Sequence, residues 1–325
     1  MTSLGKDIAA AWFMGMILPG LILNGAVMLK KTAQLPRDIQ ATEATEKATQ
    51  HPSSELTMYL RNRDGSIGER NMDAYLVEAV LAEMPASFGE EELKAQAVVA
   101  RTYARKAYET GGKHGDGSVC TQSSCCQAHI TQEEYLKQGG TEESIEKVHA
   151  AVKATSGYVL TNEGTLIEAT YFSCSGGSTE DAAAVWGADY PYLQAVDSPG
   201  EENAAYYEDT VFFTPREFCD ALGISLSGSP SGWFGPVSYT EGGGVDTMNI
   251  GGKAYRGTEL RSALSLRSTR FTVAADETTI AITTRGYGHR VGMSQYGADA
   301  MAAAGSTYPD ILAHYYPGTS LSWMG

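Results

Sequence analysis

Basic residues are scarce in this chain of 325 residues: 24 Lys and Arg stand against 39 Asp and Glu, a formal net charge of −15 at pH 7. A negative field of this size repels phosphate backbones, which excludes general nucleic-acid binding. Cysteine is scarce too, and an odd number of five residues argues against a disulfide scaffold. Hydrophobic residues make up 42% of the chain, which excludes wholesale disorder and allows a sizeable core.

Formal charge is absent from Ile8 to Leu29, a run long enough as a helix to cross the roughly 30 Å hydrocarbon layer of a membrane. We interpret residues 1–31 as an uncleaved, single-pass membrane anchor. A cleaved signal peptide is the alternative, but the run is long for such a peptide and no clear A-x-A site follows it. Residues 32–54 lack apolar periodicity and predict a flexible linker, so residues 55–325 form the folded part.

The carboxylate of Glu83 is predicted to lie at a helix corner, where one helix ends and a second begins shortly after it. The apolar pattern of Met72–Met84 predicts a helix that Pro85 stops, which places Glu83 at the helix end. A second helix is predicted from Phe88 to about Glu109, because that stretch contains almost no helix breaker. Such a corner is a candidate site for general acid or base chemistry.

The second predicted helix begins with Ser87 and Glu90 at the spacing of a capping box. Lys94, Arg101 and Tyr108 recur every seven residues along it and share one face. This cationic stripe beside a carboxylate indicates a site for a polar, anionic ligand. A solvated helix face beside a terminal Glu is the alternative interpretation.

Four ordered blocks carry a family resemblance. The run Met72–Tyr108 (MDAYLVEAVLAEMPASFGEEELKAQAVVARTYARKAY) resembles the opening motif of the stage II sporulation protein D family, in which E-M-P precedes A-L-K-A-Q-A-V-A-A-R-T-Y. The resemblance covers nearly all of Leu56–Leu321. It continues in the blocks Tyr171–Glu180 (YFSCSGGSTE), Val185–Val196 (VWGADYPYLQAV) and Gly286–Ala298 (GYGHRVGMSQYGA), and in HYYPGTSL near the terminus.

The resemblance implies a membrane-anchored peptidoglycan lytic transglycosylase that acts outside the mother-cell membrane during engulfment of the forespore. It implies glycan strands as substrate, and a sporulation amidase and endopeptidase and membrane proteins of the engulfment complex as partners. The family's catalytic acid maps onto Glu83. One carboxyl group suffices, because the sugar attacks itself to form a 1,6-anhydro ring and no water enters. Burial or neighbouring carboxylates must then raise the pKa of Glu83.

Candidate substrate-binding residues lie in each block. Guanidinium and ammonium donors can hold sugar oxygens or lactyl carboxylates, a surface salt-bridge pair being the alternative for the helix stripe. Hydroxyls before the Gly176–Gly177 turn and polar groups in the GYGHRVGMSQYGA loop can reach sugar hydroxyls, although a lone His is more often structural. The family usually has Gly where Arg290 stands. The candidates are Lys94, Arg101, Gln127, Tyr171, Ser173, Ser175, His289, Ser294, Gln295 and Tyr296.

Cysteines gather in one loop. His114, Cys120 and Cys126 are six residues apart, with Cys125 and His129 within reach, so the loop predicts tetrahedral zinc, a disulfide from Cys120, or free thiols. The resemblance favours zinc, because some relatives with this pattern bind it beside the active-site cleft. In such relatives the residue before the last Cys, here Cys125, can be the fourth ligand. Such a saturated site has a structural role, and it carries the next residue, Gln127, toward the cleft.

Two other functions stay open. One is a non-enzymatic peptidoglycan-binding enhancer of a partner amidase, since the domain family includes such proteins. The other, a zinc amidase or peptidase, ranks last because no H-E-x-x-H or similar open ligand set is present. The expected fold is α+β, with mainly antiparallel strands and a substrate cleft, preceded by a transmembrane helix. Strands are expected in the Tyr158–Leu166, Val211–Thr214, Ala254–Arg256, Phe271–Ala274 and Thr278–Thr284 regions.

Overall fold

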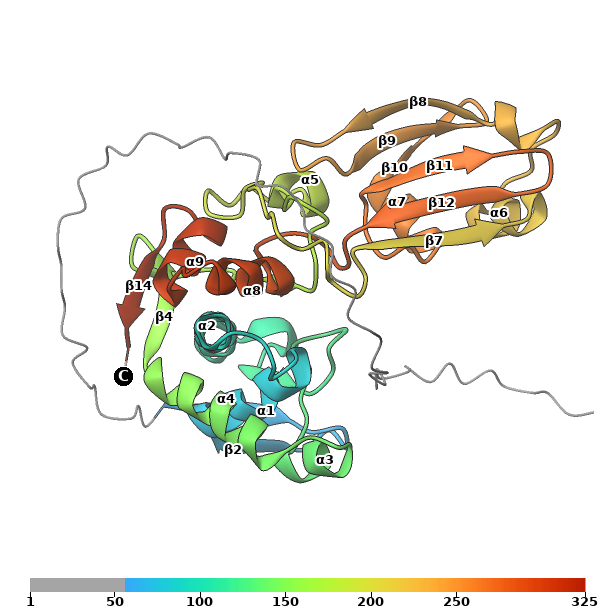
Figure 1. Cartoon of the computed structure of the whole chain (residues 1–325). Helices are drawn as coiled ribbons and strands as arrows, with labels where there is room; N and C mark the ends of the chain where they lie inside the picture. The colour runs from blue at the N-terminus through green and yellow to red at the C-terminus, as the bar shows by residue number, and fades with distance from the viewer. Residues whose placement is uncertain (1–55, 325) are drawn as a thin grey trace, which may run out of the picture. The chain divides into compact units, whose positions relative to one another are not determined.

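The computed structural model describes residues 56–324, so the predicted anchor and linker lie outside the described residues. Within 56–324, no helix is both long and apolar enough to cross a bilayer. The expected α+β architecture with mainly antiparallel strands is confirmed (Figure 1). The helices are α1 Met72–Glu83, α2 Glu90–Thr110, α3 Gln132–Lys137, α4 Glu142–Ala154, α5 Ala182–Trp186, α6 Pro215–Leu222, α7 Gly257–Ala263, α8 Gln295–Ala303 and α9 Tyr308–Tyr315.

The strands form small sheets of two or three members. Two pairings are parallel, β1 with β3 and β6 with β13, and the other sheet pairings are antiparallel. The strands are β1 Thr57–Arg61, β2 Ile67–Asn71, β3 Ser118–Cys120, β4 Tyr158–Asn162, β5 Thr165–Leu166, β6 Tyr171–Phe172, β7 Glu208–Phe213, β8 Phe234–Tyr239, β9 Val245–Ile250, β10 Lys253–Arg256, β11 Phe271–Ala275, β12 Ile280–Arg285, β13 Met293–Ser294 and β14 Ser320–Trp323.

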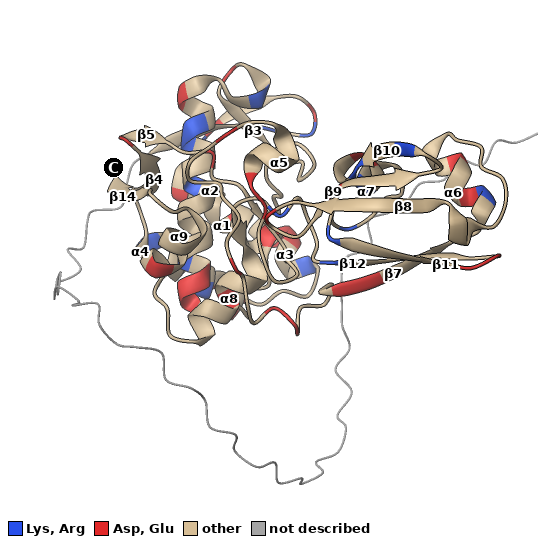
Figure 2. Cartoon of the chain, turned by 90° about the horizontal axis from the view of Figure 1, so that it is seen from above, with Lys and Arg blue, Asp and Glu red and all other residues tan. Residues whose placement is uncertain are grey.

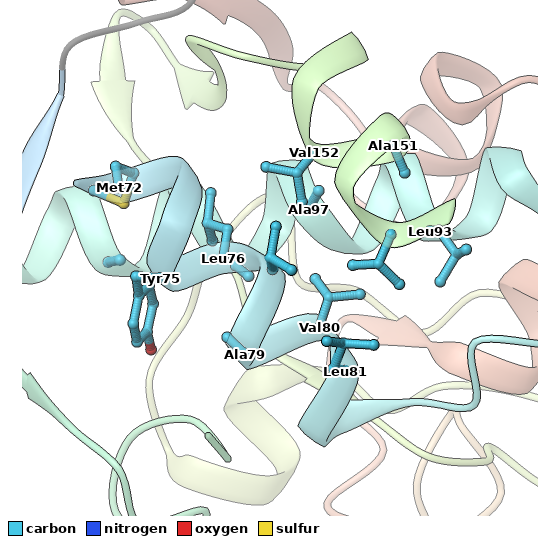
Figure 3. Close-up of a cluster of buried hydrophobic side chains, with 14 of the residues drawn as sticks. Met72, Tyr75, Leu76, Ala79, Val80, Leu81, Leu93, Ala97, Ala151 and Val152 are labelled. Carbon is cyan, nitrogen blue, oxygen red and sulfur yellow. The ribbon is translucent and has the colours of Figure 1, made fainter. Parts of the chain in front are cut away.

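Helix α2 is the centre of the helical region. Figure 1 shows it end-on, with α8 and α9 on one side and α1 and α4 on the other. Its small residues, such as Ala97 and Ala100, are fully buried and let neighbouring helices approach closely. In Figure 3 the side chains of Leu76 and Val80 of α1 lie among those of Leu93 of α2 and Val152 of α4. This packing fixes the end of α1, where Glu83 stands.

Residues 208–285 form a second packing unit, which we call the β region. It contains two three-stranded sheets, ordered β10-β9-β8 and β11-β12-β7, together with α6 and α7. Figure 1 shows the two sheets facing each other. Apolar side chains from both, including Met248 of β9 and Ile282 of β12, share one core with Phe218 of α6. The chain enters the β region shortly after the VWGADYPYLQAV block and leaves it at the GYGHRVGMSQYGA loop.

Most expected elements are confirmed, with shifted ends. The predicted Tyr158–Leu166 strand is a β4–β5 hairpin, and the four other strand regions correspond to β7, β10, β11 and β12. The capping box is wrong: α2 is capped by Gly89 with no side-chain hydrogen bond to its first turn. Gly89 N–H instead donates to Asp299 of α8 at 2.7 Å, so a tertiary contact replaces the local cap.

Candidate functional site

The carboxyl group of Glu83 lies at the end of α1, half-buried and bonded on two sides. Ala128 N–H donates to Glu83 Oε1 at 2.5 Å, and the Tyr171 hydroxyl forms a second hydrogen bond to the carboxyl. Burial raises the pKa of Glu83 above its ordinary value, and the two hydrogen bonds, which favour the anion, only partly oppose it. A carboxyl group with a raised pKa and donors for its ionised form can both give and take a proton.

Three further groups connect to this carboxyl in a chain of hydrogen bonds. The Tyr75 hydroxyl donates to Gln127 Oε1 at 2.9 Å, and Gln127 Nε2 donates to the Tyr171 hydroxyl at 3.3 Å. Tyr75 and Gln127 are almost fully buried. Because the Tyr171 oxygen accepts from Gln127, its own proton is directed at Glu83. The predicted candidates Gln127 and Tyr171 therefore lie together at the carboxyl.

The GYGHRVGMSQYGA block approaches Glu83 from another side. The parallel β6–β13 pairing brings the start of α8 to Tyr171. Gln295 Nε2 donates to the backbone oxygen of Glu83 at 3.3 Å. Tyr296 packs edge-on against Phe88, with ring centroids 5.0 Å apart. Gln295 thus holds the backbone at the helix end, and Tyr296 packs against the turn after it.

His289 lies between two aromatic rings. Its ring centroid is 5.6 Å from that of Phe172 and 5.2 Å from that of Trp186, which is 44% exposed. Burial, together with the positive charges of Arg261 and Lys113, lowers the pKa of His289 to about 4. The imidazole is therefore neutral at pH 7 and offers polar groups, not charge, to a neighbouring solute.

The two cations predicted to bind substrate, Lys94 and Arg101, both form ion pairs with carboxylates of the protein. Lys94 Nζ is 2.8 Å from carboxylate oxygens of Glu90 and Glu91 on its own helix. This is the salt-bridge interpretation that is the alternative to substrate binding. Arg101 is fully buried, ion-paired with Asp73 at 3.1 Å, and donates to three backbone carbonyls at the end of α4 and the start of β4. A substrate-binding role for Arg101 does not fit this position, because α2 faces the core there.

Ser175 and Ser294 are also fully buried, which does not fit direct sugar binding. Both hydroxyls donate to the carboxylate of Glu201, at 2.8 and 2.5 Å, and the backbone oxygen of Ser173 accepts from Ser294. The turn glycine Gly176, at φ +74°, packs where a Cβ would lie 2.7 Å from the backbone of residue 285. The turn therefore allows a close approach of backbone to backbone, not the predicted approach to a ligand.

Arg290, at the position where the resemblance leads us to expect Gly, has the left-handed backbone conformation at φ +66°. Its guanidinium is fully buried and pairs with Glu180 at 2.9 Å. It also donates to the backbone oxygens of Ser175, Ser178 and Gly242. These bonds join the SGGSTE turn to a hairpin of the β region. They also stabilise the positive φ of Arg290, which residues other than glycine rarely adopt.

The predicted metal ligands come together. Donor atoms of His114, Cys120, Cys125 and Cys126 all lie within 4.8 Å of one another, and all the described cysteines are free thiols. The Cys125 and Cys126 sulfurs are 3.9 Å apart, and Cys126 Sγ is 3.6 Å from His114 Nε2. Tetrahedral zinc with Zn–S bonds of about 2.3 Å requires S–S edges of roughly 3.8 Å. The donor set therefore fits structural zinc, and His129 lies outside it, paired with Glu78.

This cluster is covalently continuous with the supports of Glu83. Cys126 is followed directly by Gln127, which bonds Tyr171, and by Ala128, whose N–H bonds the carboxyl. A ligand that fixed the cluster would fix both donors as well.

A cleft at Glu83 stays a prediction. Two hollows within residues 56–324 are lined by other groups, one including Glu180 and Arg256 and the other Arg270 and Arg285.

Sequence reasoning missed Tyr75, Glu201 and Trp186. Tyr75 lies two i,i+4 steps before Glu83 on the same predicted helix, a spacing that could have drawn attention to it. Trp186 stands in a block that carried the resemblance, where an aromatic residue suits sugar binding. Glu201 lies in a loop between the VWGADYPYLQAV and GYGHRVGMSQYGA blocks, and no local pattern distinguishes it from a surface carboxylate.

Comparison with known proteins agrees with the motifs. A family model described as Stage II sporulation protein (SpoIID) matches residues 61–162. The chain is 39% identical over 304 residues to Stage II sporulation protein D of Bacillus subtilis (strain 168), covering 92% of this chain and 87% of the relative. It is 35% identical to the protein of the same name from Bacillus amyloliquefaciens, covering 94% and 90%. An Amidase enhancer of Bacillus subtilis is 29% identical over 74% of this chain and 39% of its own length.

Proposed function

Because this chain belongs to the stage II sporulation protein D family, we propose that it is a lytic transglycosylase of peptidoglycan that acts in wall remodelling during sporulation. The bond cleaved is the one between N-acetylmuramic acid and N-acetylglucosamine. The observation that carries the proposal is the environment of Glu83, a half-buried carboxyl with a raised pKa and two hydrogen-bond donors. One such group is what the chemistry needs.

In the first step Glu83 begins protonated and donates its proton to the glycosidic oxygen. The bond from that oxygen to C1 of the muramyl sugar breaks, and positive charge develops at C1 and the ring oxygen. The carboxylate that remains accepts from Ala128 N–H and from the Tyr171 hydroxyl. These bonds stabilise the anion at the moment it forms, while the anion faces the positive charge on the sugar.

In the second step the muramyl O6 attacks C1 and its proton passes to Glu83. The C1–O6 bond forms, the product is a 1,6-anhydro sugar, and the carboxyl group is protonated again. No water is consumed, so no second carboxylate is needed to activate one. Gln127 and Tyr75 hold the Tyr171 hydroxyl in the orientation that serves both steps.

We further propose zinc as a structural ion held by His114, Cys120, Cys125 and Cys126. When bound, the ion contributes no acid or nucleophile, because four protein ligands leave no open position for water. The chain's own Gln127 and Ala128 act on the carboxyl from a backbone that such a ligand set fixes.

The location proposed for the protein is the cell membrane, with residues 1–31 as anchor and the folded part outside the cytoplasm. Tethering keeps the folded part at high effective concentration near the wall, which suits a chain of net charge −15 that does not bind an anionic polymer by bulk charge. Partners proposed are a sporulation amidase and endopeptidase and membrane proteins of the engulfment complex.

The test is digestion of glycan strands by the purified chain, with products analysed by mass spectrometry. We expect 1,6-anhydromuramyl ends, and we expect Glu83→Gln to lower the rate by about 10²–10⁴, the usual contribution of a general acid. Glu143→Gln, a change in an exposed carboxylate of α4, is the control and leaves the rate unchanged. Reducing ends in place of anhydro ends, or unchanged turnover in Glu83→Gln, would overturn the assignment.

The similarity to an Amidase enhancer favours one alternative, a wall-binding protein that stimulates a partner amidase without chemistry of its own. The same Glu83→Gln variant separates the two functions. An enhancer forms no anhydro ends when alone, and it stimulates an added amidase equally well with or without the Glu83 carboxyl.

A further inference from the structure

Arg270 of the β region differs from most of the other half-buried and buried arginines. Arg101, Arg267 and Arg290 each pair with a carboxylate. The guanidinium of Arg270 has neither a hydrogen bond nor an ion pair within residues 56–324. Arg261, which is similarly buried, also lacks both. A guanidinium carries five donors, and leaving them without acceptors in a partly buried position is costly.

This guanidinium lies across two glycines. A Cβ built on Gly177 would lie 3.4 Å from Arg270 Nη1, and one built on Gly243 would lie 3.7 Å from Arg270 Cζ. Both glycines have positive φ, so neither position readily takes a side chain that could cover the cation. Arg270 is therefore flanked by bare backbone on the SGGSTE turn and on the β-region hairpin.

Arg270 also lines a hollow of about 310 Å³. This volume is near the lower end of small-molecule pockets, roughly 300 Å³. The charged side chains of the lining are the guanidiniums of Arg270 and Arg285 and the carboxylate of Glu208, which pairs with Arg285 at 2.9 Å. Figure 2 shows the acidic start of β7 beside the basic end of β12. The lining thus has one positive charge without a counterpart.

The remaining lining is suited to a polar ring. Thr272 and Thr283 offer hydroxyls, and Tyr239 is 60% exposed, so its ring face is available at the rim. An aromatic face beside hydroxyls and a cation matches a sugar or peptide that bears a carboxylate. A phosphate dianion fits less well, because the lining has one unpaired positive charge, which a single carboxylate already matches.

We propose that this hollow is a carboxylate-binding site for the wall polymer, with Arg270 as the residue that binds the anion. The choice of polymer rests on the proposed function, while the choice of carboxylate rests on the hollow. Two carboxylates of peptidoglycan have this chemistry: the lactyl group of a muramic acid without a peptide, and the free end of a stem peptide. Arg290, whose pKa is lowered first by burial and also by the charge of Arg270, is paired with Glu180 and does not compete for the ligand.

The experiment measures dissociation constants by calorimetry on the full chain carrying Glu83→Gln, so that cleavage of the glycan is slowed. The probes are a muramic-acid tetrasaccharide with free lactyl carboxylates, a stem tetrapeptide with a free carboxyl end, and the amide of each. We expect at least one acid to bind about tenfold more tightly than its amide, as for a charge-assisted hydrogen bond. We expect Arg270→Gln to remove this preference and Arg270→Lys to keep part of it.

Arg216→Gln is the matched control, because its guanidinium is 91% exposed on α6 of the same region and should not change either constant. A preference seen with the sugar assigns the lactyl group, and one seen with the peptide assigns the stem. Equal binding of acid and amide, no binding of either acid, or a preference that survives Arg270→Gln overturns the proposal. Because the readout is affinity in a chain without the Glu83 carboxyl, this result is independent of whether the chain cleaves glycan.

Discussion

The helical region around Glu83 and the β region use charged and polar groups in different ways. In the helical region, Arg101 and Gln127 are buried and bonded to neighbours within the fold, so they fix positions. In the β region, Arg270 lines a hollow with no partner among the described residues. A charge that is satisfied internally holds geometry, whereas a charge left unsatisfied at a hollow is available to a solute.

The largest effect is expected at the junction of the two regions. Arg290→Met leaves the Glu180 carboxylate buried without its counter-charge, so the free energy of unfolding should fall by about 3–5 kcal/mol. Urea denaturation of the parent and variant chains measures this loss of unfolding free energy. Arg216→Met, which breaks an exposed pair with Asp220, should cost less than about 1 kcal/mol. If both variants cost the same, the buried pair does not join the regions as described.

The Cys/His cluster tests whether fixed geometry matters at Glu83. Cys126→Ser should remove zinc, which we expect at about one ion per chain, and lower activity roughly 10–100-fold because the backbone through Ala128 loosens. Metal analysis, thermal unfolding and turnover are the measurements. Cys219→Ala, a change far from the cluster in α6, should keep the metal. A parent chain without metal, or a fully active Cys126→Ser chain, contradicts the prediction.

A smaller effect is expected from Tyr171→Phe. In the parent chain the Tyr171 hydroxyl stabilises the Glu83 anion by a hydrogen bond, so removing the hydroxyl raises the pKa of Glu83 further. Activity needs the protonated acid and declines as pH rises through this pKa, so the declining limb should move to higher pH, with less than about tenfold loss at the optimum. Rates from pH 5 to 9 measure the shift. Tyr108→Phe on α2 should leave the profile in place, and an unmoved limb in Tyr171→Phe would separate that hydroxyl from Glu83.

Glu92 is an exception within the helical region. It is fully buried on α2, without a hydrogen bond to any described residue, and burial and then Asp299 raise its pKa well above the ordinary value. A pKa raised by folding gives stability that is present below the unfolded pKa and is lost as pH rises toward the folded pKa. Glu92→Gln should therefore be nearly neutral at pH 4 and stabilising by about 1 kcal/mol or more at pH 8. Parallel stability curves for parent and variant would show that Glu92 has a partner.

The sequence predicted the helix corner and five strand regions because apolar periodicity and Pro85 act locally. It failed at the start of α2, where Asp299, 210 residues away from Gly89, takes the N–H that a local cap would have taken. It also did not reveal the shared core of the β region, because sheet partners and stacked faces come from segments distant in the chain.

For the site, the sequence by itself determined which groups are present: a carboxyl group at a helix end and a loop that contains His114 and three cysteines. Only the tertiary structure decided which polar residues are available to a ligand. Arg101 and Ser175 became internal partners of buried groups, and Arg270 did not. The physical reason is that residue type and spacing fix what a side chain can donate or accept, whereas its burial and its partners depend on segments far apart in the sequence that folding brings together.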